Sequence, residues 1–146
     1  MNRPLAAIAF SLAVSLCGTA IAQVDISNPR RLMFAADATD NIIDVVDLID
    51  EEVVFRIETK YPIDDLVATP YAPVLVYTNI ERRLVSVYDL KSQKLAREIE
   101  LPIAPRHMVL DTSGTKIGFS DSVDGGFVLF SPYAAAILFT LEDFPP

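Results

Sequence analysis

Cysteine, histidine and tryptophan are almost absent from this sequence. Its 146 residues include one cysteine, Cys17, one histidine, His107, and no tryptophan. Cys17 lies in an N-terminal segment typical of a secretory signal, so the mature chain is expected to have no disulfide, thiolate metal ligand or cysteine nucleophile. Without tryptophan, a stacked-aromatic sugar site is not indicated. The folded core must therefore be stabilised by packing alone, without a disulfide or a thiolate-bound metal.

Basic residues are also scarce. Twelve lysines and arginines stand against twenty aspartates and glutamates, which gives a formal net charge of −8 at pH 7. Such a chain is poorly suited to binding DNA, RNA or an anionic membrane surface. With 51% hydrophobic and 22% charged residues, it does not have the composition of a disordered segment either. We expect no nucleic-acid partner.

No hydrophobic run is long enough to span a bilayer. The mainly apolar residues 5–16 follow Arg3 and precede Ala20-Ile21-Ala22. A positive start, a short apolar run and a small-x-small site are typical of a secretory signal peptide, and such a run is too short for a transmembrane helix. We expect residues 1–22 to be removed and residues 23–146 to be periplasmic or secreted, without a membrane span.

The remainder of the chain contains a repeat of 42 residues. At this offset similar residues fall at the same position in three successive copies: Val45, Val87 and Leu129; Asp37, Asn79 and Asp121. The copies cover residues 23–64, 65–106 and 107–146. Repeats of this length indicate an array of supersecondary units that pack against their neighbours.

Each copy contains four short apolar runs separated by polar turns. In the second copy the runs are residues 66–68, 74–78, 84–89 and 95–99. Short runs with alternating and β-branched residues predict strands. Residues 131–140 include three alanines that also suit a helix, but the repeat favours strand structure there.

Four strands in about 42 residues make the unit of a β-propeller blade. The predicted fold is therefore all-β, with three four-stranded propeller blades. Closed propellers have four to eight blades, so three form an incomplete arc. In such an arc we expect Val45, Val87 and Leu129 to be buried between blades.

The second copy resembles the YVTN-type propeller repeat. It contains Val76-Tyr77-Thr78-Asn79, then a short turn, then residues 84–90 with the sequence Leu-Val-Ser-Val-Tyr-Asp-Leu. Residues 34–37 and 42–48 are a looser match, and the third copy has Ser131-Pro132 in place of Asp-Leu. The resemblance implies kinship with secreted bacterial propellers such as the amine dehydrogenase heavy chain and lactonase-like proteins.

Polar residues gather in the loops after each second strand and before each first strand. By propeller topology these loops share one face of the molecule. The candidate ligand-binding residues there are Asp37, Asp64, Asp65, Asn79, His107, Asp121 and Asp124. Oxygen-rich loops of this kind suit Ca²⁺, but Asp and Asn also cap turns by accepting backbone N–H bonds, and their recurrence favours capping.

His107 has two interpretations. A loop that opens on a central channel gives its imidazole a possible ligand or proton-transfer role. A single histidine without cysteines is a poor transition-metal site, which favours a polar loop residue. We predict no cofactor and leave the question of a metal open.

No catalytic motif accompanies these loops. The sequence contains no G-x-S-x-G elbow, H-E-x-x-H helix or phosphate-binding glycine loop. It therefore favours an exported, non-catalytic propeller module that acts as a binding surface or scaffold. One alternative is an accessory subunit of a quinoprotein amine dehydrogenase-like or lactonase-like enzyme. Another is a truncated fragment of a longer propeller protein.

The incomplete arc also predicts a partner. Its two end faces differ, so contacts between chains are head to tail. Two chains would supply six blades, within the usual four to eight. We therefore predict a homodimer, with completion by a different propeller-completing protein as the alternative.

Overall fold

The computed structural model describes residues 29–37 and 39–142; the expected signal, residues 1–22, lies outside them. Within the described residues no helix is long and apolar enough to cross a membrane. The elements in chain order are η1 (Pro29–Arg31), a short 3-10 helix, and the strands β1 (Leu32–Asp37), β2 (Ile42–Asp47), β3 (Glu52–Glu58), β4 (Asp65–Ala68), β5 (Val74–Asn79), β6 (Leu84–Asp89), β7 (Lys94–Glu100), β8 (His107–Leu110), β9 (Ile117–Ser120), β10 (Phe127–Ser131) and β11 (Ala136–Leu141).

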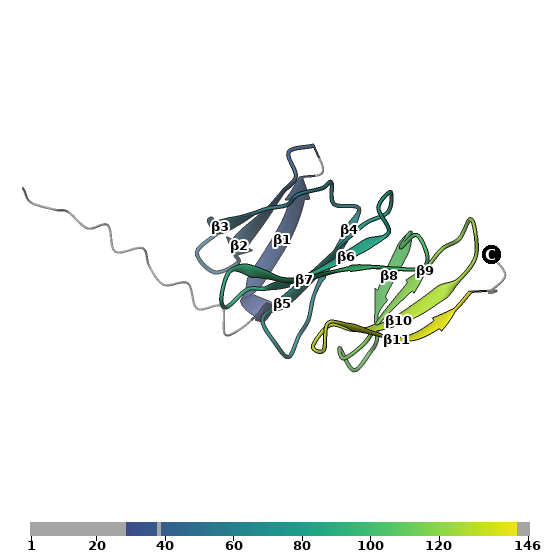
Figure 1. Ribbon diagram of the computed structural model, residues 1–146. Coiled ribbons are helices and arrows are strands. Elements are labelled where there is room, and N and C mark those ends of the chain that lie inside the picture. The colour runs from purple at the N-terminus through teal and green to yellow at the C-terminus, as the bar shows by residue number, and fades with distance from the viewer. Residues whose placement is uncertain (1–28, 38, 143–146) are drawn as a thin grey trace, which may run out of the picture.

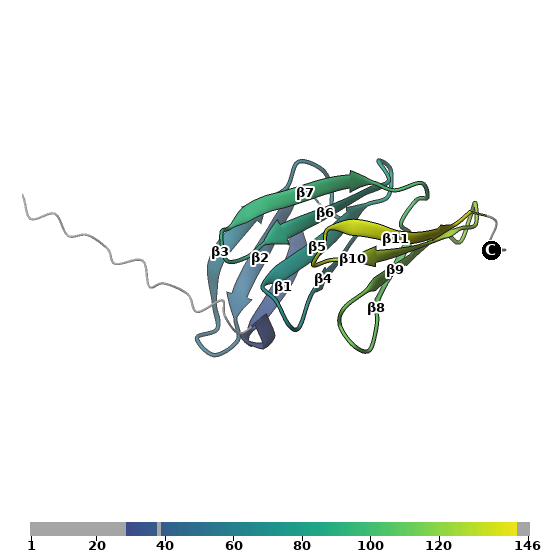
Figure 2. The same cartoon turned by 60° about the horizontal axis from the view of Figure 1, so that its bottom comes forward.

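The strands form three antiparallel sheets, each made of consecutive strands. The first sheet has the order β1-β2-β3, the second β4-β5-β6-β7 and the third β8-β9-β10-β11. Figure 1 shows them following one another from violet through green to yellow, with the first and third at opposite ends. The turned view of Figure 2 again places the second sheet between them. The described chain is therefore all-β, with sheets that resemble propeller blades.

The 42-residue repeat is visible in the backbone. The bounds of β5, β6 and β7 are those of β1, β2 and β3 moved by 42 residues, and β8 relates to β4 in the same way. In each sheet the pairing of the last two strands contains a register shift at the same repeat position. The shift comes directly after Val45, Val87 and Leu129. Positive φ values also recur at equivalent turns: Asn41, Arg83 and Gly125; Glu51, Gln93 and Ala135. Residues 23–26, the counterpart of β4 in the first copy, lie outside the described residues.

The apolar runs located the strands well. The four runs predicted in the second copy differ from β4, β5, β6 and β7 by at most one residue at each end. In the third copy, β11 shows that the segment after the alanines is a strand. Although Ser131-Pro132 replaces Asp-Leu there, β10 ends at the same repeat position as β6.

Neighbouring sheets pack through alternate residues. In β5, Leu75 and Tyr77 lie in the first core, between the first and second sheets, whereas Val76 lies in the second core, between the second and third. Successive side chains of a strand point to opposite faces, so β5 is buried on both sides. The first core comprises Leu32, Ile43, Val45, Ile57, Ile63, Leu75, Tyr77, Tyr88 and Leu90. The second core comprises Val76, Val85, Val87, Leu101, Ile103, Ile117, Phe119, Val128 and Phe130.

The three equivalent positions expected to be buried differ in exposure. Val45 is fully buried in the first core and Val87 is 3% exposed in the second. Leu129 is only partly buried. It occupies the side of the third sheet that faces away from the second, where no further described sheet covers it. The prediction is therefore confirmed for two positions, and the third is more open because of its place at the end of the row.

The short first strands of neighbouring sheets also meet, because β4 contacts β8. The turn before β9 lies against the corresponding turn of the second sheet: a Cβ on Gly114 would be 2.4 Å from Cγ of Pro70. Gly114 has a φ of +67°, which glycine adopts without strain. Glycine at this position thus permits both the turn and the close approach.

Candidate ligand-binding loop face

Hydrogen bonds join the loops predicted to share a face in the second and third sheets. The Asn79 amide donates from Nδ2 to the carbonyl oxygen of Pro62 at 2.9 Å. The N–H of Ile80 donates to Asp64 Oδ2 at 2.6 Å. In the third sheet the N–H of Ala104 donates to Oδ2 of Asp121 at 3.3 Å. In the second and third sheets, the turn after the second strand is thereby tied to the loop before the first strand.

The recurring Asp and Asn side chains cap these turns. Oδ1 of Asp37 accepts the N–H of Thr39 at 2.9 Å. The amide oxygen of Asn79 accepts the N–H of Arg82, also at 2.9 Å. Oδ1 of Asp121 accepts the N–H of Val123 at the same distance. These bonds are the backbone caps that the sequence favoured, and they hold the turns in one conformation.

Asp121 is the most enclosed acidic group of this face. Burial acts to raise its pKa, but backbone N–H bonds from Val123, Asp124 and Ala104 and the guanidinium of Arg106 together lower it. Nε of Arg106 lies 3.1 Å from Asp121 Oδ1. The buried carboxylate therefore stays charged and structurally engaged.

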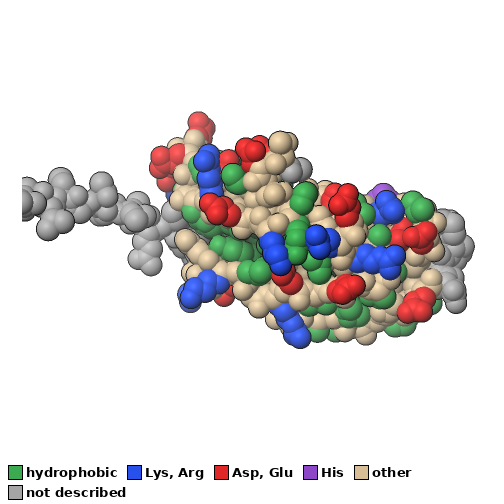
Figure 3. All heavy atoms as spheres, turned by 45° about the horizontal axis from the view of Figure 1, so that its top comes forward, with side chains coloured by type: hydrophobic (Ala, Val, Ile, Leu, Met, Phe, Trp, Pro, Cys, Tyr) green, Lys and Arg blue, Asp and Glu red, His purple; other side chains and the backbone are tan. Residues whose placement is uncertain are grey.

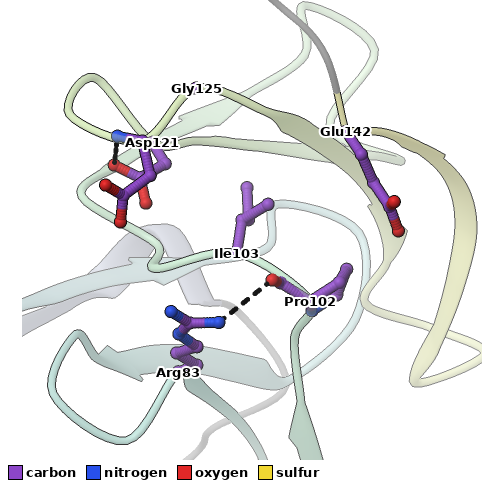
Figure 4. Close-up of a pocket in the computed structure, with 7 residues that line it drawn as sticks. Arg83, Pro102, Ile103, Asp121, Gly125 and Glu142 are labelled. Atoms are coloured by element: carbon purple, nitrogen blue, oxygen red, sulfur yellow. Dashed lines mark hydrogen bonds between the residues drawn. The ribbon is translucent and has the colours of Figure 1, made fainter.

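A pocket of about 300 Å³ opens beside Asp121, between the second and third sheets. Its lining combines the β5–β6 turn, the β7–β8 connection, the β9–β10 turn and the end of β11. The lining residues are Arg83, Pro102, Ile103, Asp121, Asp124, Gly125 and Glu142. Figure 4 shows Asp121 and Glu142 on opposite sides of Ile103, with Arg83 reaching Pro102.

The pocket places opposite charges around a small apolar area. Nη1 of Arg83 donates to the carbonyl oxygen of Pro102 at 3.4 Å. Asp124 and Glu142 are exposed acidic residues. Ile103 is held close to the β9–β10 turn, since a Cβ on Gly126 would be 2.7 Å from its Cγ2. The lining therefore combines two exposed carboxylates, one guanidinium group and a small apolar area.

The structure brings together two of the seven predicted residues, Asp121 and Asp124, at this pocket. Asn79 lines a second, smaller hollow beside Tyr61. His107, expected in the loop before the strand, is instead the first residue of β8, where it pairs with Ser120. Its side chain is exposed, with Nε2 3.2 Å from the hydroxyl of Ser122. The three remaining aspartates are all exposed: Asp37 is the last residue of β1, Asp64 lies in the loop before β4, and Asp65 is the first residue of β4.

Sequence reasoning missed Arg83, Ile103 and Glu142 as pocket residues. Arg83 is an exposed turn residue and the repeat counterpart of Gly125, which also lines the pocket. Comparing equivalent turns of neighbouring copies would have found it. Glu142 gave no such signal, because its position depends on how the third sheet packs against the second.

Charged side chains are mixed over the surface. Figure 3 shows acidic, basic and hydrophobic side chains interspersed on the face turned to the viewer. Within residues 29–37 and 39–142, no group of three or more His, Cys, Asp or Glu side chains is arranged to hold a metal ion.

Two solved structures are similar to this chain. A Kuenenia stuttgartiensis hydrazine synthase matches with a TM-score of 0.68 and 17% identity, covering 80% of this chain and 34% of that chain. The dihydro-heme d1 dehydrogenase NirN in complex with DHE matches with a TM-score of 0.63 and 16% identity, covering 78% of this chain and 25% of that chain. Both have propeller-type folds, so the chain shares a propeller-like architecture.

This chain spans about a third and a quarter of those two chains. At such low identity the likeness shows the fold alone. No protein-family model matches the sequence, and no curated protein matches it. Kinship with the YVTN-type repeat stays a prediction.

Proposed function

We propose that the chain is an exported, non-catalytic propeller-like module that binds a small amine- or ammonium-bearing ligand. The observation that carries this proposal is the pocket of about 300 Å³ between the second and third sheets. Asp124 and Glu142 supply acceptors for a cationic group, and Pro102 and Ile103 supply apolar contact. The acidic balance of the chain adds a general attraction for cations.

The hydrogen bonds of the loop face support a binding role. The capped turns and the Arg106–Asp121 pair hold the lining in place before any ligand arrives. A site fixed in this way loses little conformational entropy on binding. Apolar contact with a few placed polar groups is also the usual character of small-molecule sites.

Titration by heteronuclear NMR tests the proposal, with ethanolamine, glycine betaine and arginine as probes at millimolar concentration. We expect at least one probe to shift the resonances of residues that line the pocket. The double variant Asp124→Asn and Glu142→Gln should lose that response. Glu52→Gln, at an exposed glutamate of β3 outside the pocket, is the matched control and should keep it. Absence of any response to the three probes, or equal binding by the double variant, would contradict the proposal.

An accessory subunit of an enzyme is the second candidate function. It rests on the resemblance of residues 76–79 and 84–90 to the YVTN-type repeat. Turnover of an amine or a lactone by the purified protein, or its co-purification with a redox subunit, would support this role over the binding module.

A third possibility is that the chain is part of a longer propeller protein. It covers only part of the length of both similar structures. Further copies of the 42-residue repeat encoded downstream of Pro146 would identify it as such.

A further inference from the structure

The outer face of the third sheet is apolar and has a buried counterpart elsewhere in the chain. Val85 and Val87 lie on the side of the second sheet that packs against the third, in the second core. Their counterparts 42 residues later are Phe127 and Leu129, which are only partly buried. The third sheet thus repeats a packing face without a described sheet to cover it.

Cross-strand pairing extends this face over the whole sheet. Leu129 pairs with Phe139, and Phe127 pairs with Leu141. Paired residues of antiparallel strands point to the same side. Phe139 is 52% and Leu141 39% exposed, and Val109, on the same side through the pairing of β8, β9 and β10, is 66% exposed. We call Val109, Phe127, Leu129, Phe139 and Leu141 the tail face.

The first sheet carries the complementary half of the same interface. Leu75, Tyr77 and Tyr88 place the second sheet against the first, in the first core. Their counterparts 42 residues earlier are Met33, Ala35 and Val46, which face away from the second sheet. Met33 is 48% exposed. Val53, also exposed, pairs with Val46 on the same side. We call Met33, Ala35, Val46 and Val53 the head face.

Side-chain size matches the two faces to each other. Inside the chain, the large Phe119 and Phe130 of the third sheet share a core with the smaller Val85 and Val87 of the second. On the two outer faces the order of side-chain sizes is reversed, with smaller residues on the head face and larger residues on the tail face. Ala35 stands at the repeat position of Phe119, and Phe127 stands at that of Val85. A bulky tail face therefore meets a head face with room for it, as close packing requires.

Asp44 and Arg56 lie on the same side of the first sheet as the head face, and they form an ion pair. Nε of Arg56 lies 2.7 Å from Oδ1 of Asp44, whose repeat counterpart Ser86 is buried between sheets. Covering the head face would therefore enclose Asp44 as one half of an ion pair, which is less costly than enclosing an isolated carboxylate.

We propose that two copies of this chain associate head to tail, with the tail face of each packed on the head face of the other. Two such contacts close a ring of six sheets, within the range of known propellers. The contact repeats, between chains, the packing that already joins the first sheet to the second and the second to the third. It does not depend on the pocket, so it can fail while the proposed binding function stands.

Sedimentation velocity of the expected mature chain, residues 23–146, across the low micromolar range tests the proposal. We expect a dimer for the wild type. Phe139→Asp on the tail face and Met33→Asp on the head face should each weaken self-association about tenfold or more. Val123→Asp is the matched control, because Val123 is 62% exposed in a loop outside both faces. Circular dichroism establishes that each variant is folded.

Mixing the two variants separates head-to-tail contact from other arrangements. The intact tail of Met33→Asp can meet the intact head of Phe139→Asp, so the mixture should form a heterodimer through one native contact. A tail-to-tail dimer would be insensitive to Met33→Asp and would overturn the proposal. A wild-type monomer, an open polymer or a mixture without heterodimer would do the same.

Hydrogen exchange of the wild type provides a test that does not depend on folding of the variants. Amides of β1 and of β10 and β11 should become more protected as protein concentration rises. Protection that is independent of concentration would contradict the head-to-tail contact.

Discussion

Truncation of Val87 to alanine measures how strongly the second and third sheets hold each other. Val87 is 3% exposed and shares the second core with Ile117 and Phe119. The substitution removes two methyl groups from a packed site and leaves a cavity that its neighbours fill only in part. We expect the free energy of unfolding to fall by about 1 to 3 kcal/mol, below the range for Leu→Ala because fewer atoms are lost.

The repeat supplies two matched controls for this truncation. Val45 occupies the same position in the first sheet and is fully buried, so Val45→Ala should cost a similar amount. Leu129 occupies the same position in the third sheet but is partly exposed. Leu129→Ala removes more atoms, yet in the monomer it should cost less, about 1 kcal/mol or below, because water already reaches part of the side chain. The local strand environment is equivalent in all three, so the difference isolates packing between sheets.

Urea denaturation followed by far-UV circular dichroism is the assay, at a concentration where the chain is monomeric. With a slope of about 2 kcal/mol per molar urea, a loss of about 2 kcal/mol lowers the midpoint by about 1 M. The slope itself should not change. A cost below about 0.5 kcal/mol for Val87→Ala, or a cost for Leu129→Ala greater than that of Val87→Ala, would refute the assigned packing of the sheets.

Three further predictions follow from local contacts. Gly114→Ala should destabilise the fold by about 1 to 3 kcal/mol in the same assay, because its φ is positive and the new Cβ would meet Pro70; an unchanged midpoint would contradict this. The pKa of Asp47 is lowered from 3.8 to about 2, chiefly by the hydrogen bond from Arg31, so this group adds stability above pH 4 that is lost as the pH falls towards 2. Asp47→Asn should therefore reduce the loss of stability between pH 4 and 2, and an acid-unfolding profile identical to the wild type would argue against the pairing. If residues 1–22 are a signal, N-terminal sequencing of the protein from a cell-envelope fraction should begin at or near Gln23, whereas an unprocessed N-terminus on soluble cytoplasmic protein would refute export.

Local features were predictable because they depend on neighbouring residues. Alternating apolar residues located the strands of the second copy to within a residue. Asp and Asn after the second strands predicted caps, since these side chains reach backbone N–H groups only two or three positions away, as Asp121 does with Val123. The shared loop face followed from strand order alone.

The pocket was not predictable in the same way. Arg83 and Glu142 lie far apart in the sequence, and only the packing of the third sheet on the second brings both to one cavity. The Arg106–Asp121 pair is a different case, because the antiparallel pairing of β8 with β9 sets residue 106 opposite residue 121. The packing of one sheet on another leaves no pattern of short period in the sequence.

The sequence by itself determined the repeat of 42 residues, the strands within it and the turns that join them, because strand alternation and turn capping act over a few residues. Only the tertiary structure decided which equivalent positions are covered. Val87 and Leu129 share a repeat position, yet one is buried between two sheets and the other is partly exposed at the end of the row. A side chain is buried when a neighbouring sheet covers its face. Whether such a sheet is present depends on how the sheets pack together, not on the sequence of any one strand.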